Sequence, residues 1–148
     1  MELNREDSRN LLETLRITPD ATLPSRAHAD DAGLDLYCNK DVSMEPGTGA
    51  VLETGIAVAL PQGSVGLVAD RSSLAKKGVK SAGGVIDAGY RGEIRIVLWN
   101  LSKEPVHLKK GERVAQLLIF PVLLLNPVEV TKLDDSVRGS RGFGSSGK

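Results

Sequence analysis

Short apolar stretches separated by clusters of glycine, proline and aspartate run along most of the chain, and this pattern predicts β-strands joined by turns. Leu34, Leu36 and Cys38 alternate with polar or aromatic neighbours, as is typical of a half-buried strand. Ile56, Val58 and Leu60 repeat the same period of two. The turn residues recur about every 8–12 residues, so the pattern favours an all-β sandwich or barrel.

The pattern also predicts where the individual elements lie. A first strand begins at 15–17, and residues 49–60 form a strand pair. Residues 85–86 and 93–98 form a β-hairpin around the turn 87–89. One short helix follows 70, with a serine capping its start and Gly78 suiting its C-terminal cap. Further strands are expected at 64–69, 112–121 and 122–130.

The length of 148 residues suits one domain with a real core. We expect an N-terminal extension over 1–14, a β-barrel domain over 15–136 and a flexible C-terminal tail over 137–148. The tail is rich in glycine and serine, which by composition alone indicates disorder.

Charge and composition exclude several function classes. Lys plus Arg equals Asp plus Glu at 19 each, so no long-range field favours nucleic acid or an anionic membrane. Aromatic residues make up only 3% of the chain, too few for a platform that stacks single-stranded nucleic acid. Cys38 is the only cysteine, which excludes an internal disulfide and agrees with a cytoplasmic location. No apolar run reaches membrane-spanning length.

Three places carry candidate chemistry. In 83–92, Asp87 can take a proton from water and Tyr90 can lie against a ring, although these are also ordinary turn residues. Arg71 with two hydroxyls at a helix start suits a phosphate, although simple capping explains the serines equally well. Gln116 lies among apolar residues and needs a hydrogen-bond partner, which is either a ligand or the backbone.

Five segments, in order, resemble the five motifs of the trimeric dUTPase family. They are Ala-Gly-Leu-Asp-Leu (32–36), Arg-Ser-Ser-Leu-Ala (71–75), Gly-Val-Ile-Asp-x-x-Tyr-Arg-Gly (84–92), Gly-Glu-Arg-Val-Ala-Gln-Leu (111–117) and Arg-Gly-x-x-Gly-Phe-Gly-Ser (138–145). Each motif is short, but their joint occurrence in order across one chain is a specific signal.

The resemblance implies a distorted, jelly-roll-like β-barrel of the β-clip type, assembled as a homotrimer with shared active sites. It implies hydrolysis of dUTP to dUMP and pyrophosphate, which limits uracil in DNA and supplies dUMP for dTMP synthesis. It implies Mg²⁺, carried mainly by the triphosphate and reached by Asp35 through water. No nucleic-acid or membrane partner is expected.

The same resemblance assigns residues. Asp87, Gln116 and Ser72 are implied as catalytic, with Asp87 activating water for attack on the α-phosphorus. The implied substrate-binding residues are Arg71, Ser72, Ser73, Ser81, Gly84, Val85, Ile86, Asp87, Tyr90, Arg95, Gln116, Arg138, Phe143 and Gly144. Among these, the tail residue Phe143 is implied to stack on uracil and Arg138 to meet phosphate.

Some positions depart from the motifs. Asp70 stands where the family commonly has proline, Ser81 where it often has asparagine, and Arg141 where many members have glycine. A dCTP deaminase of the same fold is the main alternative, but its arginine and glutamate positions hold Lys76 and Val97 here, and valine cannot move protons. A non-catalytic nucleotide-binding trimer is the second alternative, and the acid at 87 argues against it.

Overall fold

The computed structural model describes residues 11–140 and 142, which form an almost purely β body with one helical turn. In chain order the elements are β1 (Glu13–Arg16), β2 (Leu34–Tyr37), β3 (Val42–Met44), β4 (Gly49–Glu53), β5 (Ile56–Ala59), β6 (Ser64–Ala69), α1 (Ser72–Ala75), β7 (Val79–Ala82), β8 (Val85–Asp87), β9 (Arg95–Asn100), β10 (Val106–Leu108) and β11 (Arg113–Pro121). The prediction of an all-β fold with one short helix is confirmed.

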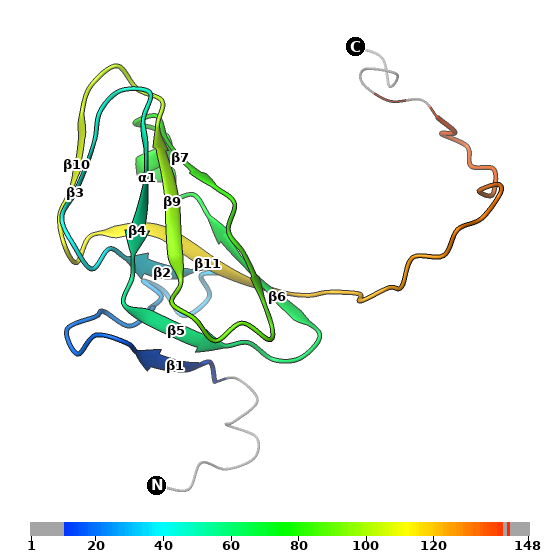
Figure 1. Ribbon diagram of the computed structural model, residues 1–148, viewed down its shortest axis with the longest axis horizontal. Helices are drawn as coiled ribbons and strands as arrows, with labels where there is room; N and C mark the ends of the chain where they lie inside the picture. The colour runs from blue at the N-terminus through cyan, green and yellow to red at the C-terminus, as the bar shows by residue number, and fades with distance from the viewer. Residues whose placement is uncertain (1–10, 141, 143–148) are drawn as a thin grey trace, which may run out of the picture.

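The strands form four small sheets around one core, with no closed barrel among the described residues (Figure 1). The largest sheet has the order β2-β11-β6-β8, and a second has the order β4-β9-β7. Two-stranded pairs, β1 with β5 and β3 with β10, complete the body. In the four-stranded sheet, Gln116 of β11 lies opposite Asp35 on one side and Ala69 on the other.

Alternation along the strands supplies the core. In β9, Ile96 and Leu98 are buried while Arg95 and Trp99 are exposed, and Leu117 of β11 is fully buried. These side chains join those of β4 and β5 in one hydrophobic cluster. Burying a large aliphatic side chain contributes about 1.5–3 kcal/mol, so the cluster holds the four sheets together without a continuous hydrogen-bonded barrel.

The predicted hairpin of 85–86 with 93–98 is wrong. β8 pairs with β6, whereas β9 pairs with β4 and β7, so the two strands belong to different sheets. The segment between them is held against β5: Ile94 N donates to Ile56 O (2.9 Å) and Thr54 Oγ1 donates to Ile94 O (2.6 Å). Ile94 is fully buried. The chain therefore passes through the core at this residue, between the sheet that contains β8 and the sheet that contains β9.

The predicted pairing within 49–60 is also wrong, because β4 pairs with β9 and β5 pairs with β1. Gly55, with a φ of 69°, turns the chain between the two strands, and its carbonyl accepts from Ile17 N (2.8 Å). That bond draws β5 toward β1. The first strand begins at Glu13, inside the segment expected to be an extension.

The helix is confirmed, but its capping is not. The residue before the first turn of α1 is Arg71, and no side chain caps the turn. The C-cap is Lys76, not the predicted Gly78, which ends the turns that follow the helix with a φ of 83°.

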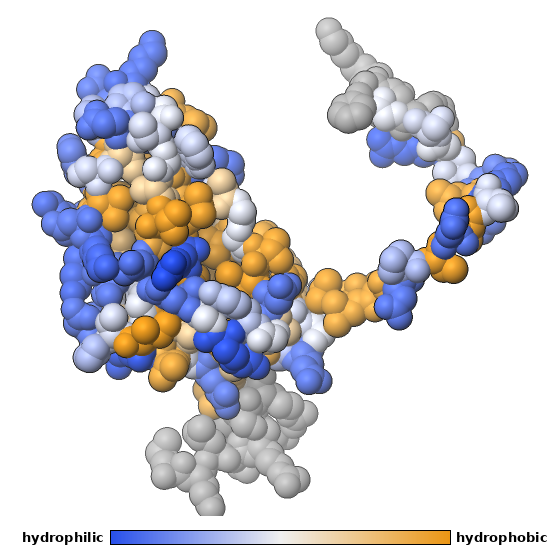
Figure 2. Space-filling view, viewed as in Figure 1, coloured by the Kyte–Doolittle hydropathy of each residue, from blue (hydrophilic) through white to orange (hydrophobic). Residues whose placement is uncertain are grey.

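The strand predicted at 122–130 is absent. After Val122 N donates to Gly63 O (2.9 Å), residues 123–140 run away from the body as an extended arm, orange in Figure 1. Leu123, Leu124 and Leu125 are each at least 80% exposed, and Figure 2 shows apolar surface where the arm leaves the body. An apolar run forms a strand only beside a partner strand, and the described part of this chain supplies none here.

No helix among the described residues is long and apolar enough to cross a membrane.

Candidate active site

One candidate site lies at the end of the four-stranded sheet where β6 finishes and β2 begins. A hollow of about 300 Å³ opens there, which we call the Asp35 hollow. It is lined by Ala27, Asp31, Ala32, Gly33, Asp35, Arg71, Ser72, Arg113 and Gln116. The register of the sheet explains the gathering, because Gln116 on β11 lies between Asp35 on β2 and the last residue of β6.

Asp35 lies between two guanidinium groups in this hollow. Its Oδ1 is 3.2 Å from Arg71 Nε, and its Oδ2 is 3.3 Å from Arg113 Nη1. Arg71 also donates through Nη1 to Arg113 O (3.0 Å). Both arginines are therefore held in place, with Arg113 keeping about half of its side chain exposed. Planar guanidinium groups fixed at one wall are suited to bind phosphate oxygens.

Gln116 has the backbone partner that its apolar surroundings require. Its Nε2 donates to Asp70 O (2.8 Å), which leaves its Oε1 facing Gly33. A Cβ built on Gly33 would overlap that oxygen and lie 3.0 Å from Gln116 Cδ. The glycine of the first motif is therefore needed because the glutamine amide occupies the space of a side chain.

Asp70 turns away from this hollow. Its Oδ1 accepts from both Ser81 N (2.7 Å) and Ser81 Oγ (2.6 Å), and its Oδ2 accepts from Lys80 Nζ. Burial raises the pKa of the Asp70 carboxyl, but the hydrogen bonds from Lys80 and Ser81 outweigh burial and hold that pKa below its ordinary value. Two of the positions that depart from the family motifs thus contact each other.

A second hollow, of about 230 Å³, lies at the β8 edge of the same sheet, and we call it the Asp87 hollow. It is lined by Gly84, Val85, Ile86, Asp87, Tyr90, Glu93 and Arg95. Asp87 is exposed at the end of β8, and its carbonyl accepts from Tyr90 N (3.0 Å), which closes the predicted turn. Val85 is 65% exposed and β8 is the edge strand of its sheet, so one side of its backbone has no partner strand within this sheet.

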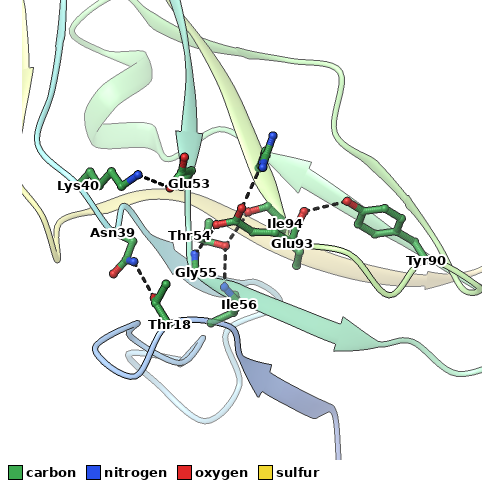
Figure 3. A network of polar contacts seen from close by, with 11 residues as sticks. Thr18, Asn39, Lys40, Glu53, Thr54, Gly55, Ile56, Tyr90, Glu93 and Ile94 are labelled. Carbon is green, nitrogen blue, oxygen red and sulfur yellow. Dashed lines mark hydrogen bonds and ion pairs between the residues drawn. The ribbon is translucent and has the colours of Figure 1, made fainter.

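Glu93 lines the Asp87 hollow and holds its neighbours through the polar contacts drawn in Figure 3. Its Oε1 accepts from Gly55 N (2.9 Å), and its Oε2 accepts from Arg95 Nε (3.1 Å). Tyr90 Oη donates to Glu93 O (3.0 Å), so the ring is held across the turn with nearly half of it exposed. A ring fixed in this way restricts what can lie beside Asp87.

The structure therefore collects the predicted residues in separate places. Arg71, Ser72, Gln116 and Asp35 share the Asp35 hollow, whereas Gly84, Val85, Ile86, Asp87, Tyr90 and Arg95 share the Asp87 hollow. Ser73 lies exposed on α1, and Ser81 lies beside Asp70. Arg138 is on the arm, while Phe143 and Gly144 are outside the described residues.

Sequence reasoning missed Arg113 and Glu93. In a regular strand, residues 113 and 116 would face opposite sides. The register of β11 shifts between Arg113 and Ala115, which buries Val114 and Ala115 in succession and puts Arg113 on the same hollow as Gln116. The charge of Arg113 within its motif was visible in the sequence, but a β-bulge was not.

A metal held by protein side chains alone does not fit the described residues, since no group of three His, Cys, Asp or Glu side chains gathers there. A metal carried by a ligand fits better. The Asp35 hollow holds two arginines and two aspartates, Asp31 and Asp35, so its side chains carry no net charge. A strongly anionic ligand in that hollow needs a further cation, and the carboxylates suit the water shell of Mg²⁺.

Comparison with known proteins agrees with the geometry. The family model described as dUTPase matches residues 19–147. The chain is 48% identical over 145 residues to a deoxyuridine 5'-triphosphate nucleotidohydrolase of Mycolicibacterium gilvum, covering 92% of this chain and 94% of that one. It is 47% identical over 141 residues to the enzyme of the same name from Corynebacterium glutamicum, covering 93% and 95%.

Solved structures show the same fold. A dUTPase of Staphylococcus bacteriophage 80alpha, in complex with dUpNHpp, superimposes with a TM-score of 0.89 at 32% identity and covers 94% of this chain and 99% of that one. A dUTPase from phage phi11 of S. aureus, described with a structural Mg(II) ion, gives a TM-score of 0.78 at 29% identity over 83% of this chain and 98% of that one. The chain belongs to the dUTPase family.

Proposed function

We propose that this chain hydrolyses dUTP to dUMP and pyrophosphate, with Asp87 activating the water that attacks the α-phosphorus. Membership of the family makes the chain a dUTP nucleotidohydrolase. The observation that carries the assignment of the base is the exposed carboxylate of Asp87 in a hollow walled by a fixed tyrosine ring. A positioned base within reach of water is what this hydrolysis requires.

The Asp35 hollow is the proposed phosphate site. Arg71, Arg113 and Ser72 offer donors to the triphosphate, and Gln116 is fixed beside them through Asp70 O. In phosphoryl transfer the protein acts mainly by positioning the nucleotide and offsetting charge. Mg²⁺ bound with the triphosphate would supply the remaining positive charge, with Asp35 and Asp31 reaching its water shell.

The Asp87 hollow is the proposed site for the deoxyuridine. Accessible backbone groups around Val85 and Asp87 can pair with the uracil edge and refuse cytosine, whose amine places a donor against a donor. Tyr90 packed on the sugar leaves no room for a 2′-hydroxyl. Arg95 is held by Glu93 at the Asp87 hollow. There it either stabilises the wall that Glu93 and Tyr90 form or binds a phosphate.

We further propose a homotrimer in which the two hollows of one site come from different copies. Within one chain the Asp35 hollow uses the β2 edge of the sheet and the Asp87 hollow uses the β8 edge, with β11 and β6 between them. A water activated by Asp87 must lie beside a phosphate bound by Arg71. Separate placement of the two in one chain supports completion by a neighbouring copy.

The exposed arm supports the same assembly. Leu123, Leu124 and Leu125 are mostly exposed along an arm that leaves the body, and burial of three leucines against a second copy would be strongly favourable. We propose that the domain expected over 15–136 includes β1 from Glu13 onward. We also propose that 137–148 close over the nucleotide, with Arg138 on phosphate, Phe143 on uracil and Gly144 letting the backbone approach the nucleotide closely. We also propose a cytoplasmic location, where DNA precursors are made.

The test combines an assay with complementation. The purified chain should release pyrophosphate from dUTP with Mg²⁺ and discriminate strongly against dCTP, dTTP and UTP. Release of ammonia from dCTP would instead indicate a deaminase.

Two inactive variants, Asp87→Asn and Arg71→Ala, then test the shared site after they are unfolded and refolded together. In a cyclic trimer with shared sites, every mixed trimer has one intact site of three. Random mixing of equal amounts makes about three quarters of the trimers mixed, so about a quarter of the wild-type activity should return. No recovery, with mixed trimers demonstrated by differential tags, would refute the shared site.

A further inference from the structure

The segment that carries Arg71 and Ser72 is anchored by a carboxylate of its own. Asp70 accepts from Ser81 N, Ser81 Oγ and Lys80 Nζ, and we call these three contacts the Asp70 bridge. About a quarter of the Asp70 side chain is exposed. Hydrogen bonds to a carboxylate are stronger than those between neutral groups, so the bridge is a rigid link rather than a surface ion pair.

The bridge joins two sheets that have no hydrogen-bonded strand pair at this point. Asp70 follows β6 of the four-stranded sheet, whereas Ser81 lies on β7, an edge strand of the three-stranded sheet. β7 pairs on its other side with β9, so the Asp70 carboxylate provides an acceptor for the Ser81 N–H at the open edge. A partly buried N–H needs such a partner.

The same residue also holds Gln116. The backbone carbonyl of Asp70 accepts from Gln116 Nε2 (2.8 Å), while its carboxylate is held on the opposite side by Ser81. Arg71 is the next residue, and its guanidinium reaches Asp35 and Arg113. The orientation of the 70–71 peptide therefore sets the positions of both Arg71 and Gln116 relative to each other.

We propose that Asp70 is a positioning residue for triphosphate binding and that Ser81 serves as its anchor instead of contacting the base. The proposal rests on the proposed phosphate site at the Asp35 hollow. Asp70 touches no substrate atom itself. It keeps Arg71, Ser72 and Gln116 arranged before the nucleotide arrives, so that their ordering is not a cost of binding.

The test measures two kinetic constants for each variant of the full chain. They are the KM for dUTP and the inhibition constant of deoxyuridine, which has no phosphate. Asp70→Ala should raise the KM for dUTP about tenfold. Ser81→Ala keeps the backbone N–H contact and should raise it less, and both should change the deoxyuridine constant less than twofold. The double variant should resemble Asp70→Ala, because residues that act through one contact are not additive. Ser81→Thr, which keeps the hydroxyl, should retain most of the affinity.

Asp41→Ala is the matched control. Asp41 likewise accepts a backbone N–H, from Lys110 (2.8 Å), and pairs with a lysine, Lys109, but it lines neither hollow. Its loss should leave both constants unchanged. Asp70→Asn keeps an oxygen for Ser81 but loses the acceptor for Lys80, so it provides a milder variant if Asp70→Ala does not fold, and it should raise the KM for dUTP severalfold.

Three other outcomes would each overturn either the inference or the proposed function. Equal weakening of dUTP and deoxyuridine by Ser81→Ala, additive with Asp70→Ala, would place Ser81 on the base and overturn the inference. Unchanged constants in Asp70→Ala and Asp70→Asn would also overturn it. Failure of the unsubstituted chain to hydrolyse dUTP would overturn the proposed function itself, which separates the two failures.

Discussion

Gly33→Ala tests the phosphate site without removing any of its polar groups. The added methyl would overlap the Oε1 of Gln116 and lie 3.1 Å from its Cβ. No positive φ is required at this glycine, so alanine is compatible with the backbone. The amide is the terminal group of a flexible side chain. We therefore expect Gln116 to rotate out of the Asp35 hollow while the sheet stays intact.

The cost follows from the contacts that are lost. The hydrogen bond from Gln116 Nε2 to Asp70 O breaks, and a neutral bond of this kind contributes about 0.5–1.5 kcal/mol to stability. In the complex, a hydrogen bond from Gln116 to a charged phosphate is worth about 1.5–3 kcal/mol. Since about 1.4 kcal/mol corresponds to a factor of ten, kcat/KM for dUTP should fall about 10- to 100-fold.

Steady-state kinetics and thermal unfolding of Gly33→Ala, Gln116→Ala and the double variant provide the measurement. The double variant should be no worse than Gln116→Ala, because the methyl acts only by displacing the amide. Gly63→Ala is the opposite control: its φ of 73° strains any other residue, yet no atom lies within 4 Å of the added methyl. It should lose about 1–2 kcal/mol of stability and keep its kcat/KM. Normal kinetics in Gly33→Ala would refute the role of Gln116.

Three further results are expected. Asp87→Asn should leave binding of dUpNHpp largely intact and lower turnover by about 10² or more, and near-normal turnover would remove Asp87 from the role of base. Truncation after Asp135 should preserve the melting temperature and lower turnover strongly, with Phe143→Ala showing a milder form of the defect; full activity of the truncated chain would refute closure by the tail. The lowered pKa of Asp70 stabilises the fold above the ordinary aspartate value of 3.8 and ceases to do so as the pH falls through the folded-state pKa. Urea unfolding of Asp70→Asn should therefore show a weaker loss of stability in acid than the unsubstituted chain.

Local spacing in the sequence predicted where strands lie better than it predicted how they pair. The alternation of Leu34 and Leu36 located β2, and with it Asp35, because a period of two is a property of the strand itself. Pairing is different, since it depends on residues far apart in the chain. Nothing local in 85–98 distinguishes a hairpin from two strands in separate sheets; burial of Ile94 decides it.

Two features of the site could not be predicted from local sequence, because they too depend on residues that are far apart in the chain or on how strands pair. Arg113 reaches the Asp35 hollow only because β11 has a bulge, which buries Val114 and Ala115 in succession. The other feature is the direction of the Asp70 carboxylate, which its partners turn away from the Asp35 hollow. Lys80 and Ser81 are ten and eleven positions away, and only the fold brings them to its carboxylate.

The placement of the two hollows leads to one more prediction, on concentration. If the Arg71 that binds phosphate and the Asp87 that activates water come from different copies, an isolated chain has no complete site, even when it is fully folded. Specific activity should then fall on dilution below the dissociation constant of the assembly, because only associated chains are active. Stopped assays over a dilution series, compared with the molecular mass measured at the same concentrations by light scattering or mass photometry, provide the test. Activity that stays proportional to concentration while the mass falls to that of one chain would mean that a single chain completes the site, and the shared-site model would be wrong.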